Sequence, residues 1–127
     1  MGLVSLALWS CNDAVDSGAD GQTNTPVIVK TLDAFTFTVD ASNLDFNLAD
    51  SLSFSGTPVV RSLVVSEYTA GAGFIIVEGS ASTVLLSDTL NGNRIIASTE
   101  YSASAPTHIA VALTDYSGKV TFSLARK

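Results

Sequence analysis

The sequence predicts an all-β protein built as an antiparallel β-sandwich, and three observations support this fold class. The chain has 127 residues, of which 46% are hydrophobic and only 14% are charged, below the ~25% typical of globular proteins. Ser, Thr, Val and Ile are frequent, which is a strand composition rather than a helix composition. After Pro26 the apolar residues recur at every second position, and turn residues separate the apolar runs at short intervals.

Nine apolar runs follow Pro26, so about eight or nine short strands are expected. Run 35–40, Phe-Thr-Phe-Thr-Val-Asp, places apolar side chains on one face and Thr on the other. Run 59–68 is apolar on both faces at its centre, which suits a central strand. The nine runs are 27–32, 35–40, 44–54, 59–68, 73–79, 82–88, 94–101, 107–115 and 119–127. Their alternation predicts a core that includes Leu63, Val65, Phe74, Ile76, Ile95, Val111 and Leu113.

Turn signals separate these runs, and Asn91-Gly92 is the strongest hairpin signal among them. An immunoglobulin-like sandwich is the expected architecture, with a small closed barrel as the alternative. The disulfide and buried Trp of antibody domains are missing, because Cys11 and Trp9 both precede the predicted domain. The likeness is therefore one of architecture only.

The first eleven residues contain an apolar run that ends at the single cysteine of the chain. Leu8, Ser10 and Cys11 resemble the lipobox of bacterial lipoproteins, in which the cysteine receives a lipid. Trp9 departs from that pattern, the run 3–9 is short for a signal core, and no basic residue precedes it. The resemblance implies lipidation of Cys11 and an extracytoplasmic location. The alternative is a short hydrophobic strand or helix that packs on the domain with Cys11 as a buried thiol.

These features divide the chain into three parts. Residues 1–11 form the signal-like segment, and residues 12–26 form an acidic, glycine-containing linker without apolar periodicity. Residues 27–127 form the predicted β-sandwich domain.

A second resemblance covers about residues 60–114. Gly73 with the run 74–77, the run 95–98 and the run 107–113 are similar to a domain of unknown function in secreted and surface-anchored microbial proteins. Ala105 and Pro106 stand where that family usually has a glycine. The resemblance implies a sandwich fold and an extracytoplasmic location, and it supplies no catalytic residues.

Composition and motifs argue against several functions. A net charge of −6 with scattered basic residues disfavours nucleic acid as a partner. His108 is the only histidine, and the chain contains no Gly-x-Ser-x-Gly motif, so a hydrolase triad is not expected. One His and one Cys are too few for a standard zinc or copper site, so neither a metal nor a cofactor is expected, although calcium in an inter-strand loop stays open.

The remaining candidates for function are surfaces. Tyr68, Tyr101 and Tyr116 stand at predicted strand ends and form a candidate binding surface, with tyrosines that cap the core as the alternative. We expect a non-enzymatic, membrane-anchored or secreted protein at the cell surface or in the periplasm. It would act by binding or adhesion, with a surface protein, a glycan or a second copy as partner. The alternative is a structural subunit of an extracellular fibre assembled by strand donation between copies.

Overall fold

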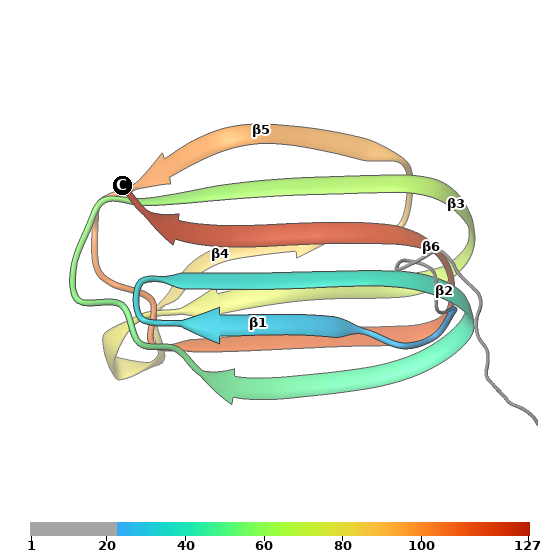
Figure 1. The fold of residues 1–127 in the computed structure, drawn as a ribbon, viewed down its shortest axis with the longest axis horizontal. Helices are drawn as coiled ribbons and strands as arrows, with labels where there is room; N and C mark the ends of the chain where they lie inside the picture. The colour runs from blue at the N-terminus through green and yellow to red at the C-terminus, as the bar shows by residue number, and fades with distance from the viewer. Residues whose placement is uncertain (1–22) are drawn as a thin grey trace, which may run out of the picture.

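The computed structural model describes residues 23–127, which form one antiparallel sheet of six strands (Figure 1). The strands are β1 (Val27–Thr31), β2 (Ala34–Ser51), β3 (Val59–Glu78), β4 (Val84–Thr89), β5 (Arg94–Tyr101) and β6 (His108–Arg126). A 3₁₀ turn, η1 (Ser80–Ser82), precedes β4. The sheet order is β1-β2-β6-β3-β4, and β5 also pairs with β3. The all-β class and the antiparallel pairing are therefore as predicted.

The described residues contain six strands rather than eight or nine, because three strands are much longer than the sequence pattern suggested. β2, β3 and β6 have 18, 20 and 19 residues, and each contains two of the predicted runs. The pairing register shifts near the middle of all three strands, between Ala41 and Phe46 in β2 and between Ser66 and Ala72 in β3. Figure 1 shows the three strands turning back at the same end of the molecule. What the sequence presents as separate strands are the two arms of bent ones.

The bends divide the sheet into two half-sheets. Half-sheet 1 contains residues 34–41 of β2, 59–66 of β3 and 118–126 of β6, together with β1 and β5. Half-sheet 2 contains residues 44–51 of β2, 72–78 of β3 and 108–114 of β6, together with β4. The ring of Phe37 from half-sheet 1 stacks on the ring of Phe46 from half-sheet 2, with centroids 5.8 Å apart. The two arms of β2 therefore meet across the core.

Unusual backbone conformations at the bends explain why these strands turn. Asn43, Glu67 and Asp115 have positive φ angles, as does Gly71 at 93°. A Cβ atom on Gly71 would collide with the backbone carbonyl of Asp115, so only glycine fits this close approach.

Side chains accept the hydrogen bonds of backbone amides at the bends. The Asp45 carboxylate accepts from the Asp115 amide at 2.8 Å, and the Ser117 hydroxyl accepts from the Asn43 amide at 3.0 Å. Two asparagines act in the same way on β3, because Asn91 Oδ1 accepts from Gly73 N and Asn93 Oδ1 from Tyr68 N, both at 2.8 Å.

The expectation of a hairpin at Asn91-Gly92 is wrong. β4 pairs with the second arm of β3 and β5 pairs with its first arm, so the two strands do not pair with each other. Their connection passes beside the bend of β3, where Asn91 and Asn93 bind the β3 backbone. Asn91 and Gly92 do lie in the connection between two strands, but this connection joins the two half-sheets rather than two neighbouring strands.

The core lies between the half-sheets and contains four of the seven predicted residues: Leu63, Val65, Val111 and Leu113 are each at most 2% exposed. The predicted burial of Phe74 and Ile95 is wrong, because their side chains are 40% and 79% exposed. Ile76 is only half-buried. In β3 the inward positions are Ile75 and Val77. Four consecutive apolar residues, 74–77, give no alternation from which the phase could be read.

The described residues 23–127 include no helix long and apolar enough to cross a membrane.

Adjacent residues of β3 provide a test of this strand phase. Ile75→Ala should lower the free energy of unfolding by about 2–5 kcal/mol, because it empties a fully buried site. Phe74→Ala is the matched control and should cost much less, since the Phe74 side chain is 40% exposed. Urea unfolding of both variants measures the difference, and equal losses would contradict the phase.

Candidate functional site

The lipidation site predicted at Cys11 lies outside the described residues, as do residues 1–10 and most of the predicted linker. The last linker residues, 23–26, are described and already contact the sheet. The Asn24 side chain donates to the Ser42 carbonyl at 3.0 Å and accepts from the Ser42 backbone amide at 2.7 Å. The backbone amide of Asn24 donates to the Asp40 carbonyl. The described chain thus meets the sheet beside the bend of β2.

The three tyrosines of the predicted binding surface do not lie on one surface. Tyr116 is fully buried and its hydroxyl donates to the Leu90 carbonyl at 2.6 Å, so its inclusion in an exposed patch is wrong. Burial, together with the neighbouring Tyr68, raises the pKa of Tyr116 to about 12. The Tyr68 ring lies 5.6 Å from that of Tyr116, and its hydroxyl donates to the Gly71 carbonyl. This pair packs at the bend, because Gly71 and Asp115 place the two residues together there.

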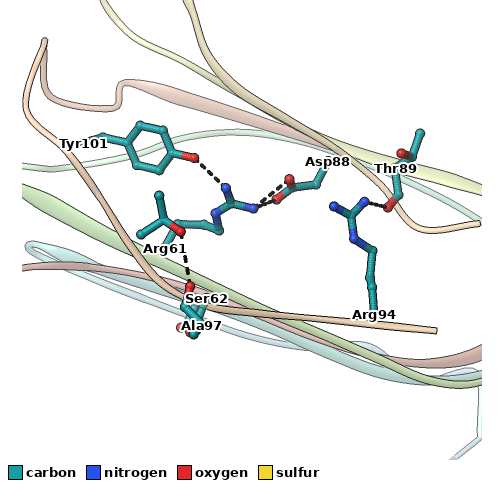
Figure 2. Close-up of polar contacts among 9 residues, drawn as sticks. Arg61, Ser62, Asp88, Thr89, Arg94, Ala97 and Tyr101 are labelled. Carbon is teal, nitrogen blue, oxygen red and sulfur yellow. Dashed lines mark hydrogen bonds and ion pairs between the residues drawn. The ribbon is translucent and has the colours of Figure 1, made fainter. Parts of the chain in front are cut away.

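Tyr101 belongs to a separate cluster, an ion pair within the core (Figure 2). Arg61 from β3 and Asp88 from β4 are 7% and 5% exposed. Arg61 Nη1 donates to both carboxylate oxygens of Asp88, at 2.6 and 2.7 Å, and Arg61 Nη2 donates to the Tyr101 hydroxyl at 2.6 Å. Because Arg61 lies in half-sheet 1 and Asp88 in half-sheet 2, this ion pair connects the two half-sheets across the core.

Arg61 Nε is buried and has no hydrogen-bond partner among the described residues. The cluster is accordingly specific but incompletely satisfied, since a buried donor without an acceptor lowers stability. Sequence reasoning missed this cluster. The only signals were a charge at an inward position of the run 59–68 and an Asp that alternates with Leu86 and Leu90.

A second polar group lies on the outer face of half-sheet 2. Ser51, His108 and Glu78 are cross-strand neighbours on β2, β6 and β3. They border an open depression of about 410 Å³ whose apolar part is formed by Ala49, Ile76 and Ala110.

Thr107 holds the His108 ring at the rim of this depression. The Thr107 hydroxyl donates to the Gly79 carbonyl at 3.0 Å and lies 3.0 Å from His108 Nδ1. The direction of the Thr107–His108 bond follows the tautomer of the imidazole, because either ring nitrogen can carry the proton. The Glu78 side chain borders the same depression from β3.

The described residues contain no group of three or more His, Cys, Asp or Glu side chains placed to hold a metal ion.

The largest cluster of exposed apolar side chains lies on β1 and its turn, which we call the apolar edge: Val27, Ile28, Val29 and Leu32. All five residues of β1 are exposed, and the strand pairs with β2 alone among the described strands. Edge strands usually carry charges that discourage pairing with another chain. The one charge on β1 is Lys30, and its Nζ is directed to Asp50 of β2 at 3.0 Å.

Comparison with known proteins adds no relative: no protein-family model matches the chain, and neither does any curated protein.

The Arg61–Asp88 pair gives a stability prediction. Asp88→Asn should lower the free energy of unfolding by about 3–5 kcal/mol, because it leaves the buried Arg61 charge without its counter-ion. The double variant Arg61→Met, Asp88→Leu should be less destabilised than the single variant, since it removes both charges. Denaturant unfolding compares the two, and a double variant that loses more than Asp88→Asn would contradict this account.

Proposed function

We propose that this chain is a non-enzymatic, extracytoplasmic protein that acts by binding or adhesion and is held at a membrane by a lipid on Cys11. In this proposal the folded-over sheet is an immunoglobulin-like β-sandwich, and a surface protein, a glycan or a second copy is the partner. Contact across the core between Phe37 and Phe46, from the two half-sheets, supports the sandwich. The lipobox-like Leu8, Ser10 and Cys11 support the anchor.

The observation that carries the binding function is the apolar edge. Val27, Val29 and Leu32 are 56%, 52% and 70% exposed. Clustered apolar side chains on a protein surface commonly mark a site of interaction. The side of β1 that faces away from β2 pairs with no other described strand, so its backbone donors and acceptors could bind an extended segment.

A second candidate function is that of a fibre subunit assembled by strand donation between copies. The isolation of β1 favours it, because this strand pairs with β2 alone among the described strands and all its residues are exposed. Donation of a strand from each copy to the next, without reciprocal exchange, gives a head-to-tail contact that does not close on itself, which is the geometry a fibre needs.

The anchor is tested at Cys11. Mass spectrometry of the chain from native membranes should find an N-terminus at Cys11 with added acyl mass. Cys11→Ala should release the protein from the membrane, because the acyl chains supply the apolar burial that holds it there. Ser17→Ala is the control and should remain in the membrane fraction. An intact chain that starts at Met1 with an unmodified thiol would exclude the anchor.

Adhesion is tested at the apolar edge. Cells that display the protein should clump, and Val29→Asp should abolish clumping because it places a charge in the centre of β1. Ile95→Asp is the matched control, since Ile95 is 79% exposed on the other edge strand of half-sheet 1. Light scattering of cell suspensions measures the effect. If both variants clump like the wild type, the apolar edge is not the adhesive surface.

A further inference from the structure

β1 is the one described strand in which every residue is exposed. Its five residues are exposed, and its ladder with β2 runs from Val27↔Thr38 to Thr31↔Ala34. No core residue belongs to β1, so its departure would remove the backbone ladder and the polar contacts of Lys30 and Asn24 but leave the core side chains in place.

The turn after β1 is firmly fixed to the rest of the protein. The Asp33 amide donates to the Ser53 carbonyl at 2.8 Å, and the Asp33 carbonyl accepts from the Arg126 amide at 2.9 Å. The Asp33 carboxylate accepts from the amide and the hydroxyl of Ser55, at 2.6 and 2.9 Å. The hydrogen bond from the Ser55 amide lowers the pKa of Asp33, so the carboxylate stays charged and keeps these bonds near neutral pH.

Asp33 is therefore the first residue that is fixed to the rest of the folded protein by several hydrogen bonds. Leu32 is the only residue between Asp33 and β1. Leu32 is 70% exposed, and Asp33 has a positive φ of 67°. A tight turn with a strained residue is a favourable hinge for exchange of the preceding strand. β4 and β5, the other short strands, are connected at both ends to strands of the sheet, so neither can leave without unfolding its neighbours.

We infer that β1 is the strand that copies of this chain exchange: Val27–Thr31 of one copy pairs with the first arm of β2 in another copy, in the register seen within one chain. This inference rests on the second candidate function, assembly by strand donation. It adds the donated strand, the acceptor strand and the hinge.

Exchange remakes the same interactions between copies that β1 makes within one chain. The ladder from Val27↔Thr38 to Thr31↔Ala34 forms between chains, as does the Lys30–Asp50 ion pair. The hydrogen bonds of Asn24 with Ser42 move in the same way, because Asn24 lies on the donated side of the hinge. The balance between the closed and exchanged forms then depends on the conformation of the hinge and on protein concentration. Two copies that exchange reciprocally form a closed dimer, whereas donation to a third copy continues as a fibre.

Cysteine cross-linking between differently tagged chains tests the inference. Val29→Cys is placed in one full-length chain and Thr36→Cys in another, both with Cys11→Ala so that the introduced thiol is the only one. These residues are direct partners in the β1–β2 ladder. After incubation together at high concentration and mild oxidation, we expect a mixed disulfide that joins the two tags on a non-reducing gel, in a yield that rises with concentration.

The matched control is the pair Val64→Cys and Thr121→Cys, direct partners in the β3–β6 ladder. Neither β3 nor β6 can leave the sheet without unfolding it, so these two chains should give no mixed disulfide.

A second variant changes the hinge. Deletion of Leu32 should prevent β1 from folding back on its own β2 and should shift the protein to larger species in sedimentation velocity.

Three outcomes would overturn the inference. A mixed disulfide in equal yield from the control pair would mean that the cross-links arise from random collision. Fibres of the wild-type chain, together with no mixed disulfide between the Val29→Cys and Thr36→Cys chains, would leave the fibre function standing but exclude β1 as the donated strand. A chain that stays monomeric at all concentrations, with or without Leu32, would exclude both the inference and the fibre function.

Discussion

The bends in β2, β3 and β6 are the constraint on which the rest of this structure depends. A single flat sheet of this composition would leave the apolar face that carries Phe35, Phe37 and Val39 in water. Because the three longest strands all turn at one end, the apolar face of half-sheet 1 meets that of half-sheet 2. The strands cross the bends without a break, so the same chain segments supply both sides of the core. Each bend interrupts the regular ladder and leaves backbone amides that need other acceptors.

Polar side chains near the bends supply these acceptors, and their positions tie separate segments together. Asp45 and Ser117 link β2 to β6, while Asn91 and Asn93 link the β4–β5 connection to β3. Away from the bends, Arg61 and Asp88 hold β3 and β4 across the core. Burial of two charges costs desolvation energy that their attraction only partly returns. The pair is therefore better understood as fixing how the half-sheets face each other than as a source of stability.

Much of the fold could be predicted from the sequence, but the continuity of the strands and some inward positions could not. Each of the nine predicted runs lies largely or wholly within a strand, because period two is a direct consequence of strand geometry. The runs 35–40 and 44–54 belong to one bent strand, in which Asn43 between them adopts a positive φ angle. The glycines at 71 and 73 signal a turn, but they do not show which residues of 74–77 face inward after it.

The buried polar clusters were harder to predict, because they are formed by pairs of residues that are far apart in the sequence. Arg61 and Asp88 are 27 residues apart and appear in the sequence as unrelated charges. Tyr116 looks like an exposed strand end, but the bend carries it under Leu90. The run 27–32 has the alternation of any other strand, and its complete exposure is visible only in the structure.

That exposure follows from the division of the protein at Asp33. The segment after Asp33 contains every residue of the core, and its own hydrogen bonds at Ser53, Ser55 and Arg126 fix the point where β1 departs. The core of the segment after Asp33 does not need apolar side chains at Val27 and Val29. Thr or Lys at these positions would form the same backbone ladder. Retention of the two valines on an exposed edge carries the risk of aggregation that edge strands usually avoid. Exchange of β1 between copies, as proposed, would give these exposed apolar side chains a role that the core of the single chain does not give them.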